Sequence, residues 1–372
     1  MKTSTERILT THVGSLSRPP ELVVLLEAQR KGQVEPEGFD EACRQAVRKV
    51  VEQQAAAGIS IISDGEQSKP SFSTYVRERW SGFGEDQVPM PLTLDEREFA
   101  NWGYRDRKLA PCVGPVTWND FSAVEKDITN LSDAASTVEH EEVFMTSVSP
   151  GTVANFFPNQ YYKGRTEYLE ALAETLRREY QAITDAGFVL QLDCPDLALR
   201  NFWFPDLSIE EFRRVIAENV EVMNHALRGI APSQLRMHVC WGAGETPKNH
   251  DVPLRSIVDI LLRANVGALS VVGANGQHEH EWHVWEETAL PDEMILIPGV
   301  IDSTTNIIEH PDWVAERIMR YANVLGRSRV IAGVDCGFGT GFSAKPAVDP
   351  AIALAKLRAL SAGATRATQE LW

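Results

Sequence analysis

Short apolar runs alternate along the chain with longer segments in which apolar residues recur every three or four positions. The runs predict buried β-strands at residues 6–15, 59–68, 143–151, 188–196, 235–242, 268–276, 294–303 and 329–339. Amphipathic segments such as 39–58, 167–187 and 311–326 predict helices, and each of these ends at a glycine. Strands that are apolar throughout are typical of a parallel sheet covered by helices.

Eight predicted strands, each leading into helix, favour an α/β fold of the (β/α)8 TIM barrel type, with a doubly wound sheet as the alternative. Neither an internal repeat nor a linker divides the sequence, so we expect a single barrel domain over residues 1–372. Residues 68–140 are rich in Trp, Pro and charge, and we interpret them as an insertion after the second strand. Within it, residues 108–118 predict an extra hairpin.

Polar and thiol side chains gather at the C-terminal ends of the predicted strands. In parallel barrels these ends form one face, where active sites are assembled from several strands. The residues are His12, Ser15, Asp64, Glu66, Asp193, Asp196, His238, Cys240, Asp302 and Cys336. Polar residues end many strands in any protein, so the prediction of an active site rests on the coincidence across most of the strands.

The fifth predicted strand ends in a histidine and a cysteine two positions apart. Because alternate residues of a strand share a face, His238 and Cys240 point to one side. Cys336 closes the last strand, which lies within reach across the mouth of a barrel. One histidine and two cysteines with a fourth position open are typical of catalytic zinc sites. The alternative is that the His-x-Cys pattern is chance and that both cysteines are packing residues.

A second histidine cluster, QHEHEWHVWEE, contains His278, His280 and His283. Its closely spaced histidines are similar to those of metal-binding motifs. We interpret it instead as the start of a helix, where acidic residues lie near the helix dipole and in solvent.

Composition narrows the class of protein. With 43% hydrophobic and 24% charged residues, the 372-residue chain is typical of a soluble globular protein. The formal net charge of −16, without a basic run, argues against nucleic acid as a partner.

Apolar runs stay well short of the ~18–20 residues that span a bilayer, and the N-terminus lacks a signal-peptide core. We therefore expect a cytoplasmic protein without membrane contact, whose five cysteines are reduced thiols. The sequence carries no signal for the oligomeric state.

Several motifs together resemble one family. TTHVGSLSRP, SDGEQSKPSFSTYV, QLDCPDLAL, HVCWG, ANGQHEHEW and VDCGFGTG occur in order along nearly the whole chain. They resemble the catalytic half of cobalamin-independent methionine synthase, and more closely its single-barrel relatives, the group that contains epoxyalkane:coenzyme M transferase. The resemblance implies a TIM barrel of the methionine synthase and uroporphyrinogen decarboxylase superfamily, with a zinc ion that activates a substrate thiol.

The resemblance also implies roles for single residues. It makes His238, Cys240 and Cys336 the zinc ligands. The residues that it implies for holding an amino-acid substrate are Ser15, Glu66 and Asp193, although carboxylates near zinc alternatively orient its ligands. We further expect Asp196 to bind substrate and Asp302 to act at the catalytic centre, unless both only cap loops.

Two departures from the family pattern bear on metal and substrate. Relatives carry a glutamate zinc ligand at the tip of the sixth strand, in a pattern like LSFEAAN, whereas this chain reads LSVVGAN with Val272 at that position. Either zinc is bound by three protein ligands with one site left open, or zinc binding is weakened or lost. The loop at 242–254 also lacks the aromatic bulk expected there. Complete methionine synthases have two such halves, one of which helps to hold folate, so a folate-dependent methionine synthase is not expected.

These patterns together predict a zinc-dependent enzyme that transfers an alkyl or methyl group to or from a small thiol. A thiolate held on zinc would attack an electrophilic carbon, such as a methyl donor or an epoxide. His12 is the candidate that would protonate an epoxide oxygen, unless its ring is satisfied by backbone carbonyls. Two alternatives remain. One is a metal-free lyase or decarboxylase on the same barrel, which Val272 favours and the retained ligands oppose. The other is a non-catalytic binder of a small thiol.

Overall fold

The computed structural model describes residues 1–372 except 31–32, 34, 102–106 and 340–345. Within this part of the chain, parallel strands form one sheet in the order β1-β6-β7-β8-β9-β10-β11. Their bounds are β1 Ile61–Ile62, β6 Glu142–Val148, β7 Val189–Asp193, β8 Leu235–Val239, β9 Ala268–Val271, β10 Ile295–Ile301 and β11 Gly333–Val334. The strand order follows the chain without reversal, which excludes the doubly wound alternative, because such sheets reverse at a switch point.

The first predicted strand lies between the two edges of this sheet. On one side Thr10 forms a parallel bridge with Ala332, whose N–H donates to the Leu9 carbonyl at 2.9 Å. On the other side the Thr10 carbonyl accepts the N–H groups of Ser60 and Ile61 at 3.1 and 3.0 Å. These bonds link the first and last strands of a curled sheet. The prediction of a curled, parallel α/β sheet is confirmed, whereas eight complete β/α units remain a prediction.

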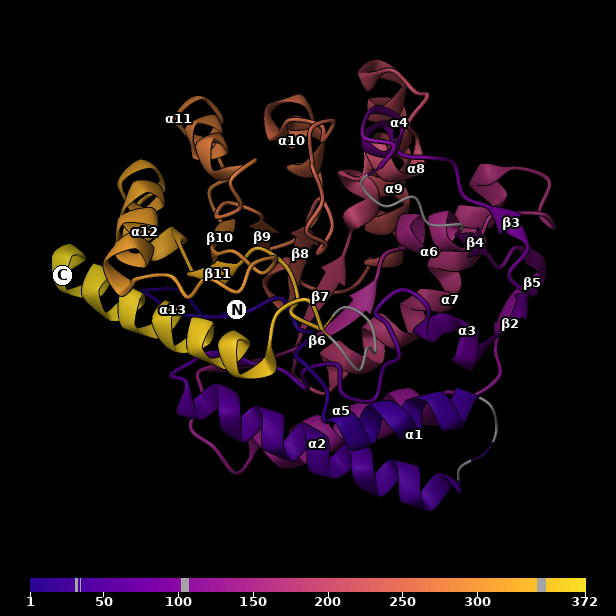
Figure 1. Ribbon diagram of the computed structural model, residues 1–372, viewed down its shortest axis with the longest axis horizontal. Coiled ribbons are helices and arrows are strands. Elements are labelled where there is room, and N and C mark those ends of the chain that lie inside the picture. Colours follow the sequence, from indigo (N-terminus) through magenta and orange to yellow (C-terminus); the bar gives the residue numbers. More distant parts are fainter. Residues whose placement is uncertain (31–32, 34, 102–106, 340–345) are drawn as a thin grey trace.

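Helices cover the outside of the curled sheet (Figure 1). The α-helices are α1 Pro20–Arg30, α2 Pro36–Ala56, α3 Tyr75–Arg79, α4 Leu94–Glu98, α5 Ser122–Ala135, α6 Pro150–Phe156, α7 Arg165–Asp185, α8 Arg200–Trp203, α9 Ile209–Ala226, α10 Val258–Leu261, α11 Val284–Glu287, α12 Pro311–Leu325 and α13 Pro350–Leu371. Short 3-10 helices are η1 Pro195–Leu197, η2 Pro232–Gln234, η3 Leu254–Ser256, η4 Glu279–His283 and η5 Arg327–Arg329. Among the helices that the structure describes, none is long and apolar enough to cross a membrane.

Two layers of buried side chains hold the fold together. The larger lies between sheet and helices, and includes Leu172 and Leu176 of α7 and Ile216 of α9. The smaller joins side chains from several strands, and it consists of Leu9, Ile61, Phe144, Val189, Ala268, Ile295, Ile297 and Ile331. Because strand residues alternate between faces, the second set packs on the face of the sheet opposite to the helices.

The segment between β1 and β6 contains two antiparallel pairs and is described except for residues 102–106. Strand β2 (Trp80–Phe83) pairs with β5 (Cys112–Trp118), and β3 (Val88–Pro89) pairs with β4 (Lys108–Leu109). The predicted hairpin at 108–118 is therefore wrong, because β4 and β5 each pair with an earlier strand. Trp80 faces Trp118 across β2 and β5, with ring centroids 5.4 Å apart, and aromatic pairs of this kind stabilise a strand pairing.

Candidate metal centre

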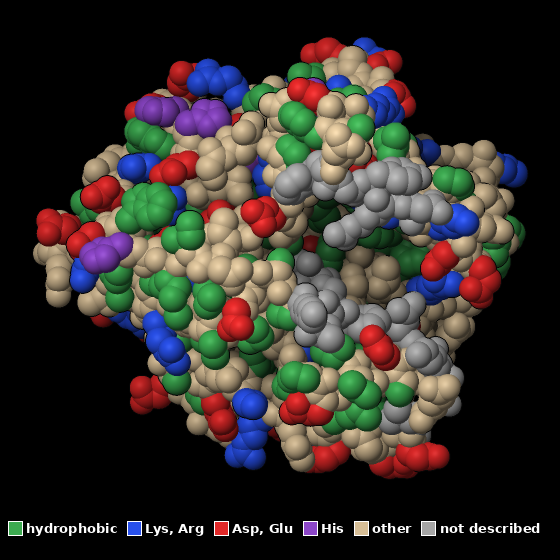
Figure 2. All heavy atoms as spheres, viewed as in Figure 1, with side chains coloured by type: hydrophobic (Ala, Val, Ile, Leu, Met, Phe, Trp, Pro, Cys, Tyr) green, Lys and Arg blue, Asp and Glu red, His purple; other side chains and the backbone are tan. Residues whose placement is uncertain are grey.

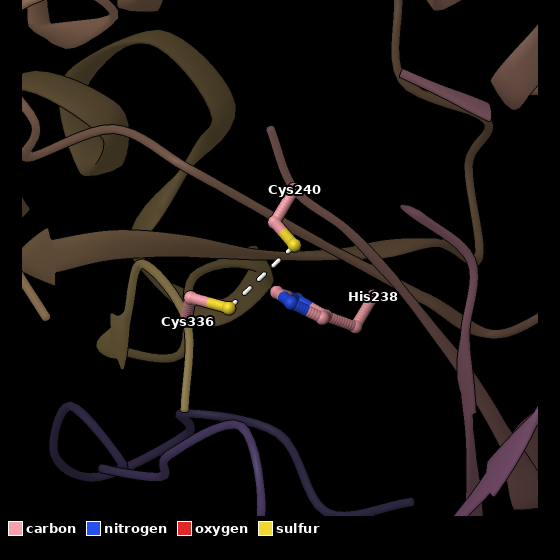
Figure 3. Close-up of side chains that lie close together, drawn as sticks. All are labelled: His238, Cys240 and Cys336. Carbon is pink, nitrogen blue, oxygen red and sulfur yellow. Dashed lines mark hydrogen bonds between the residues drawn. The ribbon is translucent and has the colours of Figure 1, made fainter. Parts of the chain in front are cut away.

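His238, Cys240 and Cys336 converge at the carboxyl ends of β8 and β11 (Figure 3). Their ligating nitrogen and sulfur atoms all lie within 4.8 Å of one another. The Cys336 thiol donates a hydrogen bond to the Cys240 sulfur at 3.5 Å. The alternation of β8 puts His238 and Cys240 on one side, as the sequence predicted. All three side chains are buried.

The electrostatics of this cluster are unusual for a protein interior. Neither ring nitrogen of His238 has a hydrogen-bond partner among the residues that the structure describes. A buried polar atom without a partner costs about 1–3 kcal/mol, so such atoms are rare unless something binds them. The hydrogen bond from Cys336, assisted by the nearby His238 ring, lowers the pKa of Cys240 well below its usual range. The cluster therefore offers an unused nitrogen and a sulfur that favours the thiolate.

The donor set fits a tetrahedral zinc ion. With bonds of about 2.3 Å to sulfur and 2.0–2.1 Å to nitrogen, tetrahedral ligand atoms lie about 3.5–3.8 Å apart. The sulfur to sulfur distance of 3.5 Å agrees with that spacing. The described residues add no fourth His, Cys, Asp or Glu to the cluster. Val272, which directly follows β9, is buried and offers no ligand atom.

Asp193 lies beside this cluster because β7 and β8 run in register, with Asp193 opposite His238. Gln191 donates to the Asp193 carboxylate at 2.8 Å, and the Arg236 guanidinium in turn donates to the Gln191 amide oxygen at 2.8 Å. Burial raises the pKa of Asp193 to about 7. The sequence analysis did not single out Gln191. A polar residue inside an apolar strand, two positions before an aspartate, could have indicated it.

Glu66 has the left-handed backbone conformation, with φ at 54°, which is unfavourable for a residue other than glycine. The Thr146 hydroxyl donates to one Glu66 carboxylate oxygen at 2.9 Å. The other oxygen is buried and unpartnered within the described ranges. Burial raises the pKa of Glu66, while nearby Lys69 and Arg18 oppose that rise. A strained backbone that presents a free carboxylate oxygen is typical of a binding site.

Ser15 packs against the turn that contains Cys336. A side chain at Gly337 would collide with the Ser15 hydroxyl, so this approach requires glycine. The Ser15 carbonyl accepts the Phe338 N–H at 3.0 Å. The structure thus brings Ser15 to the same strand ends as the cluster. The last two residues of the VDCGFGTG motif, 340 and 341, lie outside the described residues.

The role predicted for His12 does not fit its surroundings. Its Nε2 donates to the Gln54 amide oxygen at 2.7 Å, and its Nδ1 accepts the Gly14 N–H at 3.1 Å. Burial lowers the pKa of His12 to about 4. A neutral imidazole whose proton is already donated to a scaffold residue is a poor proton donor, so these hydrogen bonds favour the structural alternative, and a catalytic role of His12 stays a prediction.

Asp196 and Asp302 also have scaffold partners. The Asp196 carboxylate accepts hydrogen bonds from three side chains at 2.6–2.8 Å, those of Ser149, Thr152 and Asn219. One Asp302 oxygen accepts the N–H and hydroxyl of Thr304 at 2.8 and 2.7 Å. The Asp302 pattern matches the loop-capping alternative, whereas Asp196 is held by side chains at the start of α6 and on α9; the substrate and catalytic roles of both stay predictions. Asp64 similarly accepts the Glu66 N–H at 2.9 Å.

Asp335 was missed from sequence. One of its oxygens accepts the N–H groups of Gly273 and Ala274 at 2.8 and 2.9 Å, and this ties β11 to the end of β9. The other oxygen is buried and, among the described residues, unpartnered. Burial raises the pKa of Asp335 to about 7. Its place directly before Cys336 was the available signal.

The molecule is hollowed near the same strand ends. Figure 2 shows a depression over the region of β6, β7 and α6, with hydrophobic side chains at its wall. A small cavity there is lined by Lys69, Phe72, Tyr75, Arg79, Thr146, Ser147, Val148, Glu179 and Asp193. Asp193 thus lies between the cluster and this small cavity.

A curled parallel sheet that presents a histidine and two cysteines at its carboxyl ends defines the class of protein, an α/β fold with a candidate metal centre. Residues 8–356 match the model of a family described as the catalytic domain of cobalamin-independent synthase, and the chain belongs to this family. The resemblance inferred from the motifs is therefore confirmed.

Relatives and solved structures agree with this assignment. The methionine synthase of Saccharolobus solfataricus is 23% identical over 331 residues, which cover 88% of this chain and 87% of that protein. The methionine synthase of Sulfolobus acidocaldarius is 24% identical over 332 residues, covering 88% and 85%. A B12-independent methionine synthase from Shewanella sp. W3-18-1, solved in complex with selenomethionine, has the same fold. Its TM-score is 0.75 at 21% identity, over 98% of this chain and 99% of that one. Since these methionine synthases match along most of their length, length does not exclude that activity here.

Proposed function

We propose that this protein transfers a methyl group between a donor and a small amino-acid thiol, with the thiol activated on zinc. The observation that carries the proposal is the convergence of His238, Cys240 and Cys336, with a buried imidazole that the described scaffold leaves without hydrogen bonds. The arrangement opposes a metal-free lyase, because no described residue bonds to the buried imidazole and an unbound ring costs stability.

His238, Cys240 and Cys336 would hold the zinc ion. Bound there, zinc would supply a Lewis-acidic centre that keeps an incoming thiol in its nucleophilic thiolate form. Val272, in place of the glutamate that the family resemblance implies, would leave a ligand position open to the substrate. The methyl transfer then forms a sulfur to carbon bond and breaks the bond between the methyl group and its donor, which leaves with the electron pair.

Other residues at the strand ends would bind the part of the substrate that lies away from its sulfur. Glu66 presents a carboxylate oxygen that is free among the described residues, and Asp193 lies beside His238. These two carboxylates suit an ammonium group, and Ser15 a polar group near the metal. A homocysteine-like molecule carries both an ammonium group and a thiol. We propose that the whole chain acts as one catalytic domain.

A methyl donor is favoured over an epoxide for two reasons. The relatives described above are named methionine synthases. An epoxide oxygen also needs a proton as the ring opens, and His12 is neutral and already bonded to Gln54. Transfer of a methyl group from a positively charged donor, which leaves as a neutral molecule, needs no such proton.

X-ray absorption at the zinc edge tests the proposal. Addition of homocysteine to the zinc-loaded protein is expected to add one sulfur to the metal shell, whereas homoserine, the oxygen counterpart, adds none. The Cys194→Ser variant, altered at a buried thiol outside the cluster, is expected to behave like the unaltered protein. A shell that no thiol changes would contradict thiol activation.

A further inference from the structure

The histidine motif after β9 forms a buried polar cluster with the loop that follows β8. His278 places its Nδ1 2.8 Å from a Glu281 oxygen and its Nε2 3.2 Å from an Asp251 oxygen. Because both partners are carboxylates, both ring nitrogens donate, and the ring is an imidazolium. Burial alone would lower the pKa of His278, but the two carboxylates raise it to about 9. We call these three residues the His278 clamp.

The clamp contacts the residue next to a candidate metal ligand. The His278 ring lies against the Trp241 indole, with ring centroids 4.4 Å apart and planes 30° apart. A cation in this position is attracted by the face of the indole. Trp241 directly follows Cys240, and its Nε1 donates to the Val252 carbonyl at 2.8 Å. The clamp thus fixes the position of the residue that directly follows Cys240.

The same cluster holds both ends of the 241–254 loop. Glu281, which accepts from His278, also accepts the Leu254 N–H at 2.6 Å. Lys248 donates to the Trp241 carbonyl at 2.8 Å and is held in the left-handed region, with φ at 55°. A non-glycine residue persists in that conformation only where its surroundings enforce it. The loop is therefore built to keep one shape.

We propose that His278 is a positioning residue that sets, through Trp241, where Cys240 presents its sulfur. It acts through its neighbours and makes no contact with the reacting atoms. The inference rests on the proposed function, because it assigns Cys240 to the metal. It also gives a purpose to the QHEHEW motif, in which His278 serves the metal centre without being a ligand.

Two variants each remove the charge and half of the clamp. His278→Gln keeps a donor near the Nε2 position for Asp251, and His278→Asn keeps one near Nδ1 for Glu281. The matched control is His283→Gln, because His283 lies on the same 3-10 helix but is exposed and bonded to Glu286. Zinc affinity is measured by chelator competition, and the cobalt-substituted proteins are compared by their thiolate to cobalt absorption bands.

Both clamp variants are expected to bind zinc about 10-fold more weakly, with shifted cobalt bands, since residues that orient ligands typically contribute 10–100-fold in affinity. The control is expected to match the unaltered protein in both measurements. Hydrogen exchange of the metal-free proteins provides a readout that needs no ion, with faster exchange expected over residues 241–254 in the clamp variants alone.

The outcomes separate this inference from the proposed function. An unaltered protein that binds no zinc would overturn the proposed function, while faster loop exchange in the variants would still support the clamp. Normal zinc affinity, cobalt bands and loop exchange in both clamp variants would overturn the positioning role alone. If neither variant folds, Asp251→Asn is measured in the same way and its result decides.

Discussion

His12 and His238 have the same exposure and opposite surroundings. Each is 2% exposed and lies at an end of the parallel sheet. His12 uses both ring nitrogens, toward Gln54 and Gly14. His238 uses neither within the part of the chain that the structure describes. Most buried polar groups in proteins are satisfied, so an imidazole with both nitrogens unpartnered beside two thiols favours a ligand site over a packing residue.

The largest effect is expected from His238→Ala. Removal of a ligand should weaken zinc binding by more than about 100-fold, since even loss of an outer-shell partner costs about 10–100-fold. The metal-free variant should lose less stability than His12→Ala, because both leave a cavity but only His12 gives up hydrogen bonds to described residues. Chelator competition and thermal unfolding of the metal-free proteins check both parts. A loss of metal-free stability as large as that of His12→Ala would make His238 a scaffold residue like His12.

His278 is a third kind of buried histidine, paired on both nitrogens with carboxylates. Its folded-state pKa of about 9 lies above the unfolded value of 6.5. Its contribution is therefore fully present below pH 6.5 and is lost as the pH rises through 9. The stability advantage of the unaltered protein over His278→Gln should shrink by up to about 3 kcal/mol between pH 6 and pH 10. Urea unfolding at both pH values measures this, and an advantage that is independent of pH would exclude a charged ring.

His12→Ala should mainly lower stability and leave zinc binding intact, the opposite of what is expected for His238→Ala. It removes the partner of the Gln54 amide and leaves a cavity, at a cost of about 2–3 kcal/mol in unfolding free energy. Zinc content should stay at the level of the unaltered protein. Denaturant unfolding and metal analysis of the same preparation provide the check, and loss of zinc would return His12 to the functional site.

Asp193 and Asp196, three residues apart, offer the same comparison between a residue of the candidate site and a residue bonded to the scaffold. Asp193→Asn should raise the KM for the thiol by about 10-fold or more, because a charge-assisted hydrogen bond contributes about 1.5–3 kcal/mol. Stability should not fall, since burial already disfavours the charged form of Asp193. Asp196→Asn should instead cost about 1–2 kcal/mol of stability, through weaker bonds from Ser149 and Thr152, with KM unchanged. The opposite assignment of the two effects would contradict our reading of the site.

Much of the sheet was predictable because its strands are mostly apolar over their length. The His238 and Cys240 pair was predictable from strand alternation, and Cys336 from its position at the last strand. The roles of His12 and Asp196 were not predictable, because the partners that satisfy them, Gln54 and Asn219, come from other elements of the chain. A polar side chain at a strand end looks the same in sequence whether its hydrogen bonds are made or missing.

The clamp residues illustrate the same limit from the other direction. From sequence, the three histidines of QHEHEWHVWEE were interpreted as a solvated helix start. The structure buries His278 between Glu281 and Asp251, and only Glu281 is near it in sequence. A charged pair between distant segments leaves no local pattern for a sequence interpretation to use.

Zinc quantification on purified protein tests the central claim most directly. We predict about one zinc ion per chain in the unaltered protein and in Cys194→Ser, and almost none in Cys240→Ser or Cys336→Ser. Zinc content that neither cluster variant lowers, or an unaltered protein that cannot be loaded with zinc, would contradict the metal centre on which the proposed chemistry depends.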